Sequence, residues 1–164
     1  MSLPDGVEIR IVGPECFGLA ADFRFRMFAD IDPDADHSEE REEYTRGVAG
    51  YFERHAKDPG QVLVFAFFAG EALGCAAMTM EERPPRMGRQ RGDFAYIHNV
   101  YVLPEYRKKG IARALVARLV EEASAHPEFR ARRVGLHASI LGAPLYASMG
   151  FATSEKYMEL ELSD

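Results

Sequence analysis

The chain of 164 residues has the length of one domain, and its 47% hydrophobic and 28% charged residues are ordinary for a globular protein. These proportions exclude a collagen-like, disordered or coiled-coil chain. The net charge of −6 is concentrated in residues 30–43, which hold eight of the 26 acidic residues and one arginine. The remainder is nearly neutral and lacks the basic surplus of a general nucleic-acid binder, so we expect one domain over residues 1–164 and no nucleic-acid partner.

The first part of the chain predicts one strand followed by two helices. Residues 7–12 alternate apolar and polar side chains, as a half-buried strand does. Apolar residues at spacings of three and four predict helices over residues 15–31 and 38–57, and Asp58-Pro59-Gly60 ends the second helix.

The middle of the chain predicts three strands. Residues 61–69 form a continuous apolar run that is typical of a buried strand, and residues 71–82 return from a tight turn at Gly70 as the second strand of a hairpin. Two prolines and two glycines predict a loop over residues 83–93. The β-branched and aromatic residues of 94–102 then predict the third strand.

The last part of the chain holds the clearest helical pattern, with two adjacent apolar rows over residues 109–125. A short strand over 133–138, a short helix over 144–149 capped by Gly150, and a final strand within 151–162 follow. The element order β-α-α-β-β-β-α-β-α-β predicts an α/β fold with a mixed, mainly antiparallel central sheet flanked by helices.

Cysteine usage and hydropathy predict the compartment. Cys16 and Cys75 are too few for a disulfide framework and too far apart for a C-x-x-C metal site, so we expect both to be small buried apolar groups and expect no metal. The N-terminus has no apolar signal core, and no stretch approaches 18 consecutive apolar residues. We expect a reduced, cytoplasmic protein with no membrane partner.

The segment that carries chemistry is the turn between the strand at 94–102 and the long helix. It contains Arg107, Lys108, Lys109 and Gly110. The first turn of a helix leaves about four N–H groups without partners, and these donors and the helix dipole favour an anion such as a phosphate. The sequence holds neither G-x-x-x-x-G-K-[ST] nor G-x-G-x-x-G after a strand, which argues against a kinase, a GTPase and a dinucleotide dehydrogenase.

Two segments carry a resemblance to a known family. Arg107-Lys-Lys-Gly-Ile-Ala112 resembles the [QR]-x-x-G-x-[GA] loop of the GCN5-related N-acetyltransferases, and Leu145-Tyr-Ala-Ser-Met-Gly-Phe151 resembles their closing L-Y-x-x-[ML]-G-F segment. The order of elements over residues 7–162 also matches. The resemblance implies the acyl-CoA N-acyltransferase fold and direct transfer of an acetyl group from acetyl-coenzyme A, as co-substrate, to a primary amine.

The resemblance also implies which residues bind acetyl-coenzyme A. The strands at 94–102 and 133–138 would splay apart to admit the pantetheine arm, and one N–H near Val100 would face the thioester oxygen. The cofactor-binding residues implied are Val100, Tyr101 and Val102 beside the arm, Arg107, Lys108, Lys109, Gly110, Ile111, Ala112 and Arg113 around the pyrophosphate, and Ser139, where relatives often carry asparagine.

Acyl transfer also needs proton transfers. An alkyl amine with a pKa of about 10.4 must lose a proton before attack, and the leaving thiolate is better expelled when an O–H protonates it. By the resemblance, Tyr146 would lie near the sulfur and act as the acid. His98 shares a strand face with Tyr96 and is the candidate base, while His137 is interpreted as structural or cofactor-adjacent. The alternative interpretations are that Tyr146 packs its ring in the core and that His98 is a structural strand histidine paired with a neighbouring carbonyl.

The sequence leaves the acceptor and one alternative function open. The acidic residues 30–43 would steer a cationic amine such as a polyamine, a lysine side chain or an amino sugar, whereas the arginines of 83–91 would attract an anionic acceptor. The acceptor is a small molecule or a peptide. A non-catalytic module that binds or senses acyl-coenzyme A is the alternative function, and a homodimer is expected only by analogy with relatives.

Overall fold

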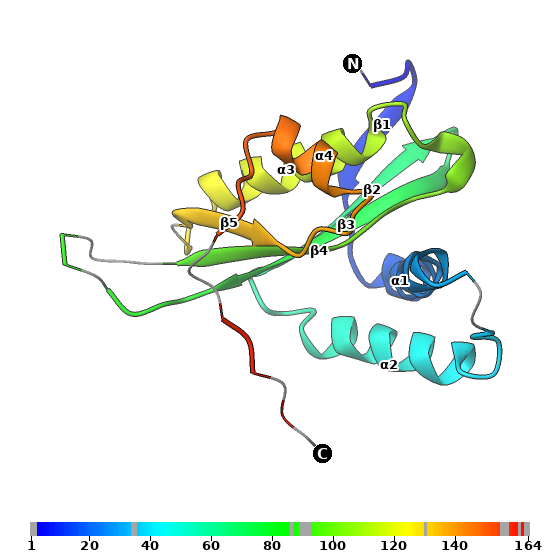
Figure 1. Cartoon of the computed structure of the whole chain (residues 1–164), viewed down its shortest axis with the longest axis horizontal. Coiled ribbons are helices and arrows are strands. Elements are labelled where there is room, and N and C mark those ends of the chain that lie inside the picture. Colours follow the sequence, from blue (N-terminus) through cyan, green and yellow to red (C-terminus); the bar gives the residue numbers. More distant parts are fainter. Residues whose placement is uncertain are drawn as a thin grey trace.

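The computed structural model describes residues 3–33, 36–85, 87–88, 93–129, 131–154, 158–160 and 162. It shows a five-stranded sheet with two helices on each face (Figure 1). The elements in chain order are β1 (Val7–Ile11), the 3-10 turn η1 (Pro14–Cys16), α1 (Phe17–Ile31), α2 (Arg41–Arg54), β2 (Gln61–Phe68), β3 (Glu71–Glu81), β4 (Phe94–Val102), the 3-10 turn η2 (Pro104–Tyr106), α3 (Ile111–Ala125), β5 (Arg133–Leu136) and α4 (Ala143–Ser148).

The strands lie in the order β1-β2-β3-β4-β5. Neighbours are antiparallel except β4 and β5, which run parallel because α3 carries the chain back between them. The parallel pairing covers only Phe94–Ile97 of β4 and Arg133–Leu136 of β5. The second half of β4 therefore has β3 on one side and, in the described chain, no strand on the other.

Two apolar clusters hold the helices on the sheet. On one face α3 packs through its buried row onto residues of β2, β3 and β4, and α4 lies beside it (Figure 1). On the other face α1 and α2 bury the phenylalanines Phe17, Phe23 and Phe52 against Leu63 and Phe65 of β2. Alternate side chains of one strand point to opposite faces, so the unbroken apolar run of β2 serves both clusters.

Most predicted elements are confirmed, with shifted ends. The helix expected from residue 38 begins at Arg41, the helix expected from 109 begins at Ile111, and β5 ends at Leu136. Gly150 has φ of +92° and follows the helix cap of α4 at Met149, as a glycine after a helix end commonly does. The described residues of the predicted loop at 83–93 lie in no helix or strand.

The predicted final strand within 151–162 is wrong for the described residues, since 151–154, 158–160 and 162 lie in no strand. Residues 155–157 and 161 lie outside the described residues. Met158, Leu160 and Leu162 alternate as strand residues do, yet their side chains are 93%, 82% and 82% exposed. The alternation is present, but nothing within the described chain covers its apolar side.

Candidate active site

An extra residue in β4 shapes the centre of the site. Cys75 of β3 lies opposite Tyr101 and Ala77 lies opposite His98. Between these two pairs β4 contains one more residue than β3, which makes a β-bulge. Asn99 accommodates the extra residue with φ of +58°. This is a left-handed conformation that asparagine tolerates better than most residues. The bulge therefore marks the point at which β4 leaves β5.

Side-chain hydrogen bonds hold the bulge against α1. Asn99 is 2% exposed, and its Nδ2 donates to the carbonyl oxygen of Ala20 at 3.2 Å. Arg24 Nη1 donates to Asn99 Oδ1 at 3.4 Å. The Cys75 thiol donates to the Asn99 carbonyl at 3.4 Å, and burial raises its pKa, which keeps the thiol protonated. Cys75 is thus a buried structural group, as predicted, whereas Cys16, also expected to be buried, is only partly buried.

Beyond the bulge, β4 offers an open backbone edge. Its pairing with β5 stops at Ile97 and Leu136, and within the described part of the chain residues 98–102 pair only with β3. An extended ligand can add to such an edge as a strand would. The predicted cofactor-binding residues Val100, Tyr101 and Val102 lie here, with Tyr101 packed toward α1 and both valines toward α3.

The loop after β4 exposes a set of backbone N–H groups. Lys108 and Gly110 have φ of +59° and +82°, and Gly110 is the N-cap of α3. The first helical hydrogen bond runs from the Ala114 N–H to the Gly110 carbonyl at 3.0 Å. In the part of the chain that the structure describes, the N–H groups of residues 108–113 have no acceptor, so they form the anion site expected at a helix start.

Arg107 is bound to protein groups on both sides of this loop. Its Nε donates to the Val102 carbonyl at 2.9 Å, its Nη2 pairs with the Asp30 carboxylate, and its guanidinium lies 5.4 Å from the ring centre of Tyr101. Asp30 offsets its charge, so Arg107 connects the loop to β4 and to the end of α1. Lys108 and Lys109 are exposed beside it.

The predicted acid, Tyr146, lies on α4 on the α3 side of the sheet. It is 9% exposed and packs edge-on against Phe151 with ring centres 5.9 Å apart. Burial raises the pKa of Tyr146, so its hydroxyl is protonated at neutral pH. Its Oη has no hydrogen-bond partner among the described residues, which leaves this proton available.

Two other predicted cofactor-binding residues, Ser139 and Arg113, make hydrogen bonds that hold α4 in place. Ser139 Oγ accepts a hydrogen bond from the Gly142 N–H at 3.1 Å, so its hydroxyl belongs to the turn that begins α4. Arg113 Nη2 donates to Ser148 Oγ at 2.5 Å and fixes α4 beside α3. Ile111 and Ala112 are the first residues of α3, and their side chains pack in the core between α3 and the sheet. Only their backbone N–H groups are therefore left to bind a ligand.

The predicted base, His98, lies on the opposite face of the sheet. Its ring stacks on Phe52 and Tyr96, with ring centres 6.4 Å and 6.1 Å away. Burial, with a smaller contribution from the Arg24 charge, lowers the pKa of His98 to about 4. His98 is therefore neutral at pH 7.

A line of polar atoms leads away from His98. Its Nε2 lies 3.2 Å from Thr79 Oγ1, and Thr79 Oγ1 lies 3.4 Å from Tyr51 Oη on α2. Tyr96 Oη lies 2.5 Å from His137 Nδ1, which places His137 beside the same aromatic group. The structure thus gathers the loop residues and the β4 edge, but it separates Tyr146 from His98 by the sheet.

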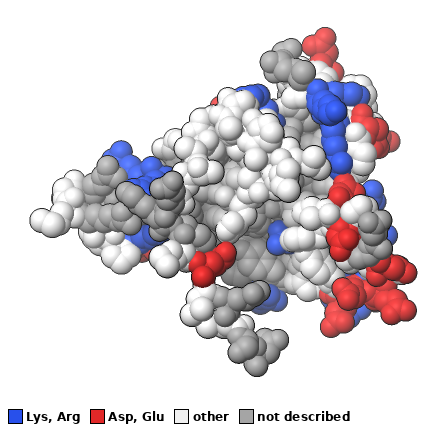
Figure 2. Space-filling model, viewed as in Figure 1, with Lys and Arg blue, Asp and Glu red and all other residues white. Residues whose placement is uncertain are grey.

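Acidic residues gather beside the start of α2, on the same end of the molecule as the basic residues of the loop after β4 (Figure 2). Glu39, Glu40 and Glu43 are exposed there. Part of the predicted acidic segment is neutralised, since Asp30 pairs with Arg107 and Glu42 pairs with Arg46 at 2.6 Å. The remaining carboxylates can attract a cation to this end.

Sequence reasoning missed the residues that position this site. Asn99 carried one readable signal, because asparagine is disfavoured in strands and favoured in left-handed conformations. Asp30, Thr79 and Tyr51 carried none, since each acts through a residue distant in the sequence.

Comparison with known proteins gives the family. The model of the acetyltransferase (GNAT) family matches residues 24–151. The chain is 31% identical over 93 residues to glucosamine 6-phosphate N-acetyltransferase of Trypanosoma brucei brucei, covering 57% of this chain and 59% of that protein. The chain thus spans less than two thirds of the length of that curated relative.

Solved structures agree on the fold. The crystal structure of a predicted acetyltransferase with acetyl-CoA from Clostridium acetobutylicum matches with a TM-score of 0.79 and 27% identity, over 94% of this chain and 96% of that one. A GCN5-related N-acetyltransferase from Ralstonia eutropha matches with a TM-score of 0.73 and 24% identity, over 95% and 99% of the two chains.

Proposed function

This chain belongs to the GNAT family of acetyltransferases, and we propose that it transfers an acetyl group from acetyl-coenzyme A directly to a primary amine. One observation carries the proposal: the free N–H groups at the start of α3 follow directly on the open edge of β4. The former suit a pyrophosphate and the latter an extended pantetheine arm. The structural relative solved with acetyl-CoA supports this choice of donor.

The residues of the loop fit the donor. Gly110 has no Cβ, so backbone N–H groups can come close to a diphosphate, and Lys108 and Lys109 add positive charge. Arg107 keeps the loop in this shape through Asp30 and the Val102 carbonyl. When bound, acetyl-coenzyme A supplies the acetyl group as a thioester whose sulfur leaves as a thiol.

The chain then supplies two groups to the reaction. A backbone N–H near Val100, on the open edge of β4, donates to the carbonyl oxygen as negative charge develops there. Tyr146, protonated because burial raises its pKa, donates its proton to the departing sulfur. Its hydroxyl has no hydrogen-bond partner among the described residues, so it breaks none of those bonds in doing so.

His98 acts on the acceptor side as a relay. An alkylammonium needs about 4.6 kcal/mol to lose its proton at pH 7. A histidine with a pKa of about 4 is too weak a base to keep that proton, so His98 passes it on. Thr79 and then Tyr51 give the proton a path toward α2, and from the partly exposed Tyr51 it passes to solvent water.

The acceptor is a primary amine drawn to the acidic end of the molecule. The curated relative is named for glucosamine 6-phosphate, an amino sugar that carries both an amine and a phosphate. We therefore place glucosamine 6-phosphate in the test panel beside a polyamine, glucosamine and a lysine peptide.

Binding is tested by thermal shift. A ligand at 100 times its Kd adds about 2.7 kcal/mol of stability, so acetyl-coenzyme A should raise the Tm while NAD should not. Gly110→Val should abolish the shift. Gly88→Val is the matched control, because Gly88 also has a positive φ (+76°) but lies in the loop between β3 and β4. Equal shifts in both variants would refute the loop assignment.

Chemistry is tested by thiol release with the amine panel. Tyr146→Phe should lower kcat at least tenfold and leave the acetyl-coenzyme A affinity unchanged. Full activity in this variant would remove Tyr146 from the reaction. Binding without turnover on any amine would instead support a module that senses acyl-coenzyme A.

A further inference from the structure

Arg24 on α1 is a partly buried cation beside the bulge of β4. Its Nη1 donates to Asn99 Oδ1 at 3.4 Å, and its guanidinium lies 5.1 Å from the ring centre of Phe28, one turn further along α1. Among the described residues it has no carboxylate partner. A guanidinium has five N–H donors in a fixed fork, so most of those of Arg24 remain available to a ligand.

The carboxylates of its own helix are already used by other arginines. The acidic residues of α1 are Asp22 and Asp30. Asp22 pairs with Arg26 at 2.8 Å, and Asp30 pairs with Arg107. The charge of Arg24 is therefore not neutralised by α1, in contrast to the two arginines that these carboxylates bind.

Arg24 lies on the side of the site where the acceptor must approach. Its partner Asn99 directly precedes Val100, near which a backbone N–H faces the thioester carbonyl in the proposed reaction. The charge of Arg24 also contributes to the low pKa of His98, so the guanidinium lies near this ring as well. An acceptor whose amine attacks beside Val100 and His98 therefore lies next to Arg24.

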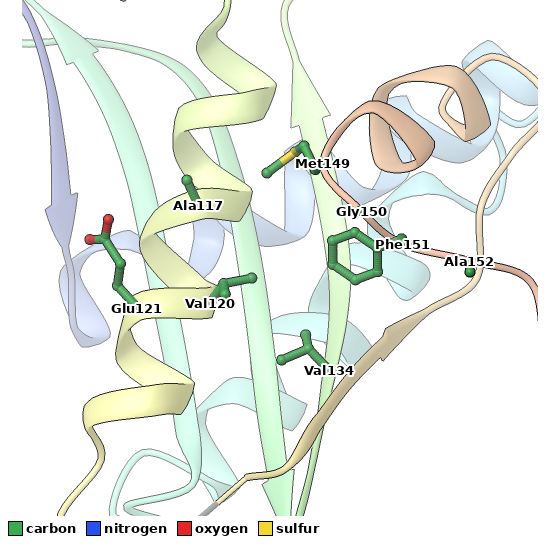
Figure 3. A pocket seen from close by; sticks show the side chains of 8 residues that line it. All are labelled: Ala117, Val120, Glu121, Val134, Met149, Gly150, Phe151 and Ala152. Carbon is green, nitrogen blue, oxygen red and sulfur yellow. The ribbon is translucent and has the colours of Figure 1, made fainter.

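Two other places suit a negatively charged part of the acceptor less well. The hollow of about 470 Å³ between α3, β5 and the residues after α4 is lined by apolar residues and Glu121 (Figure 3). It has no cation among these residues, and it lies on the other face of the sheet from α1. Arg83, in the loop expected to attract an anion, pairs with Glu81 at 3.2 Å, beside the end of β4 that is remote from the bulge.

We propose that the Arg24 guanidinium binds an oxyanion, a phosphate or a carboxylate, carried by the same acceptor molecule whose amine is acetylated. This role of Arg24 rests on the proposed acetyl transfer and narrows its acceptor to an amine that also carries an anion. A guanidinium binds either oxyanion through two parallel N–H···O bonds. A polyamine brings only positive charge toward Arg24, so we expect polyamines to be poor acceptors.

The first test compares amines in pairs that differ in the anion. The pairs are glucosamine 6-phosphate with glucosamine, and β-alanine with β-alanine amide, and thiol release from acetyl-coenzyme A gives kcat/KM for each amine. In the unmodified protein the anionic member of at least one pair should have a kcat/KM higher by about tenfold or more. The pair that shows this preference identifies the anion as phosphate or carboxylate.

Variants of Arg24 then remove the preference. Arg24→Met should reduce the ratio of kcat/KM within the pair to about one, whereas Arg24→Lys keeps the charge without the fork and should retain part of it. Arg26→Met is the matched control, because Arg26 lies on the same helix, is exposed and pairs with Asp22, and it should leave the ratio unchanged. Arg24→Gln serves the same purpose if Arg24→Met does not fold, as judged by circular dichroism.

The ratio separates recognition of the anion from a structural role of Arg24. A variant that merely loosened the bulge at Asn99 would lower kcat/KM for both members of a pair alike. Equal kcat/KM values within each pair in the unmodified protein would overturn the proposal for Arg24, while the release of thiol would leave the proposed acetyl transfer standing. An anion preference that persists in Arg24→Met also overturns it.

The second test does not depend on turnover. Thermal shift in the presence of saturating coenzyme A measures how glucosamine 6-phosphate and β-alanine bind to the unmodified protein and to Arg24→Met. A shift with either amine that is lost in Arg24→Met supports the oxyanion site even if no thiol is released, and the failure then lies with the proposed acetyl transfer. If neither anionic amine raises the Tm, or if both proteins shift equally, the proposal is wrong.

Discussion

Asn99 combines a left-handed backbone with buried hydrogen bonds, and two substitutions separate these contributions. Asn99→Ala removes the bonds to the Ala20 carbonyl and to Arg24 and also places an alanine at φ of +58°. Asn99→Gly removes the same bonds but accepts the backbone angle without strain.

The magnitudes follow from the contacts. Loss of a buried partner costs about 1–3 kcal/mol, and the left-handed conformation costs an alanine about 1 kcal/mol more. The free energy of unfolding should therefore fall by about 2–4 kcal/mol in Asn99→Ala and by about 1 kcal/mol less in Asn99→Gly. Urea denaturation of both variants beside the unmodified protein measures the difference.

Activity should follow the same order. The bulge places the open edge of β4, whereas the N–H groups of the loop belong to the start of α3, so both variants should keep most of their affinity for acetyl-coenzyme A and lose kcat. Equal stability of the alanine and glycine variants, within about 0.3 kcal/mol, would show that the φ of Asn99 carries no strain. Unchanged kcat in both would show that the bulge does not place the reacting groups.

Three further outcomes test the surroundings of the site. Because the pKa of buried His98 is about 4 and that of an unfolded histidine about 6.5, stability should rise by up to about 3 kcal/mol from pH 4 to 6.5, and His98→Gln should flatten this rise in urea melts across pH. Arg107→Met removes three contacts and should raise the Kd of acetyl-coenzyme A about tenfold by calorimetry, whereas Asp30→Asn, which breaks only an exposed ion pair, should change it less than about threefold. A Cβ at Gly74 would lie 2.5 Å from a carbonyl oxygen of β4, so Gly74→Ala should lower stability by about 1–3 kcal/mol, while Gly18→Ala, with open space around it on α1, should not.

Local patterns predicted the parts of the site that depend on neighbours in the sequence. The apolar rows of α3 and the glycine before it fix where free N–H groups occur, and Gly110 adopts the positive φ that only glycine accepts easily. The alternation of β4 also placed His98 and Tyr96 on one face correctly, since their rings stack. These predictions needed no knowledge of what the strand packs against.

Contacts between residues that are distant in the sequence could not be predicted from local patterns. The pair of Asp30 and Arg107 joins positions 77 apart and gives the acidic segment a structural use that its composition did not suggest. The low pKa of His98 depends on burial by Phe52 from α2, which no pattern within β4 reveals. The prediction of a final strand failed for a related reason. Alternation of apolar and polar residues favours a strand but does not show which strand it would pair with.

The extra residue at Asn99 determines which face of the sheet each later side chain of β4 occupies. Side chains alternate along a regular strand, and the bulge at Asn99 shifts this alternation by one residue for everything that follows. His98 faces α2, and after the bulge Val100 and Val102 face α3 while Tyr101 faces α1. If residues 98–102 instead formed a regular strand with no bulge, Val100 and Val102 would lie on the His98 side and Tyr101 would face the α3 core. β5 separates from β4 at the same level, and the sheet there has Tyr146 on one face and His98 on the other. The bulge therefore marks where β4 and β5 separate and sets which face of the sheet each side chain of residues 100–102 occupies.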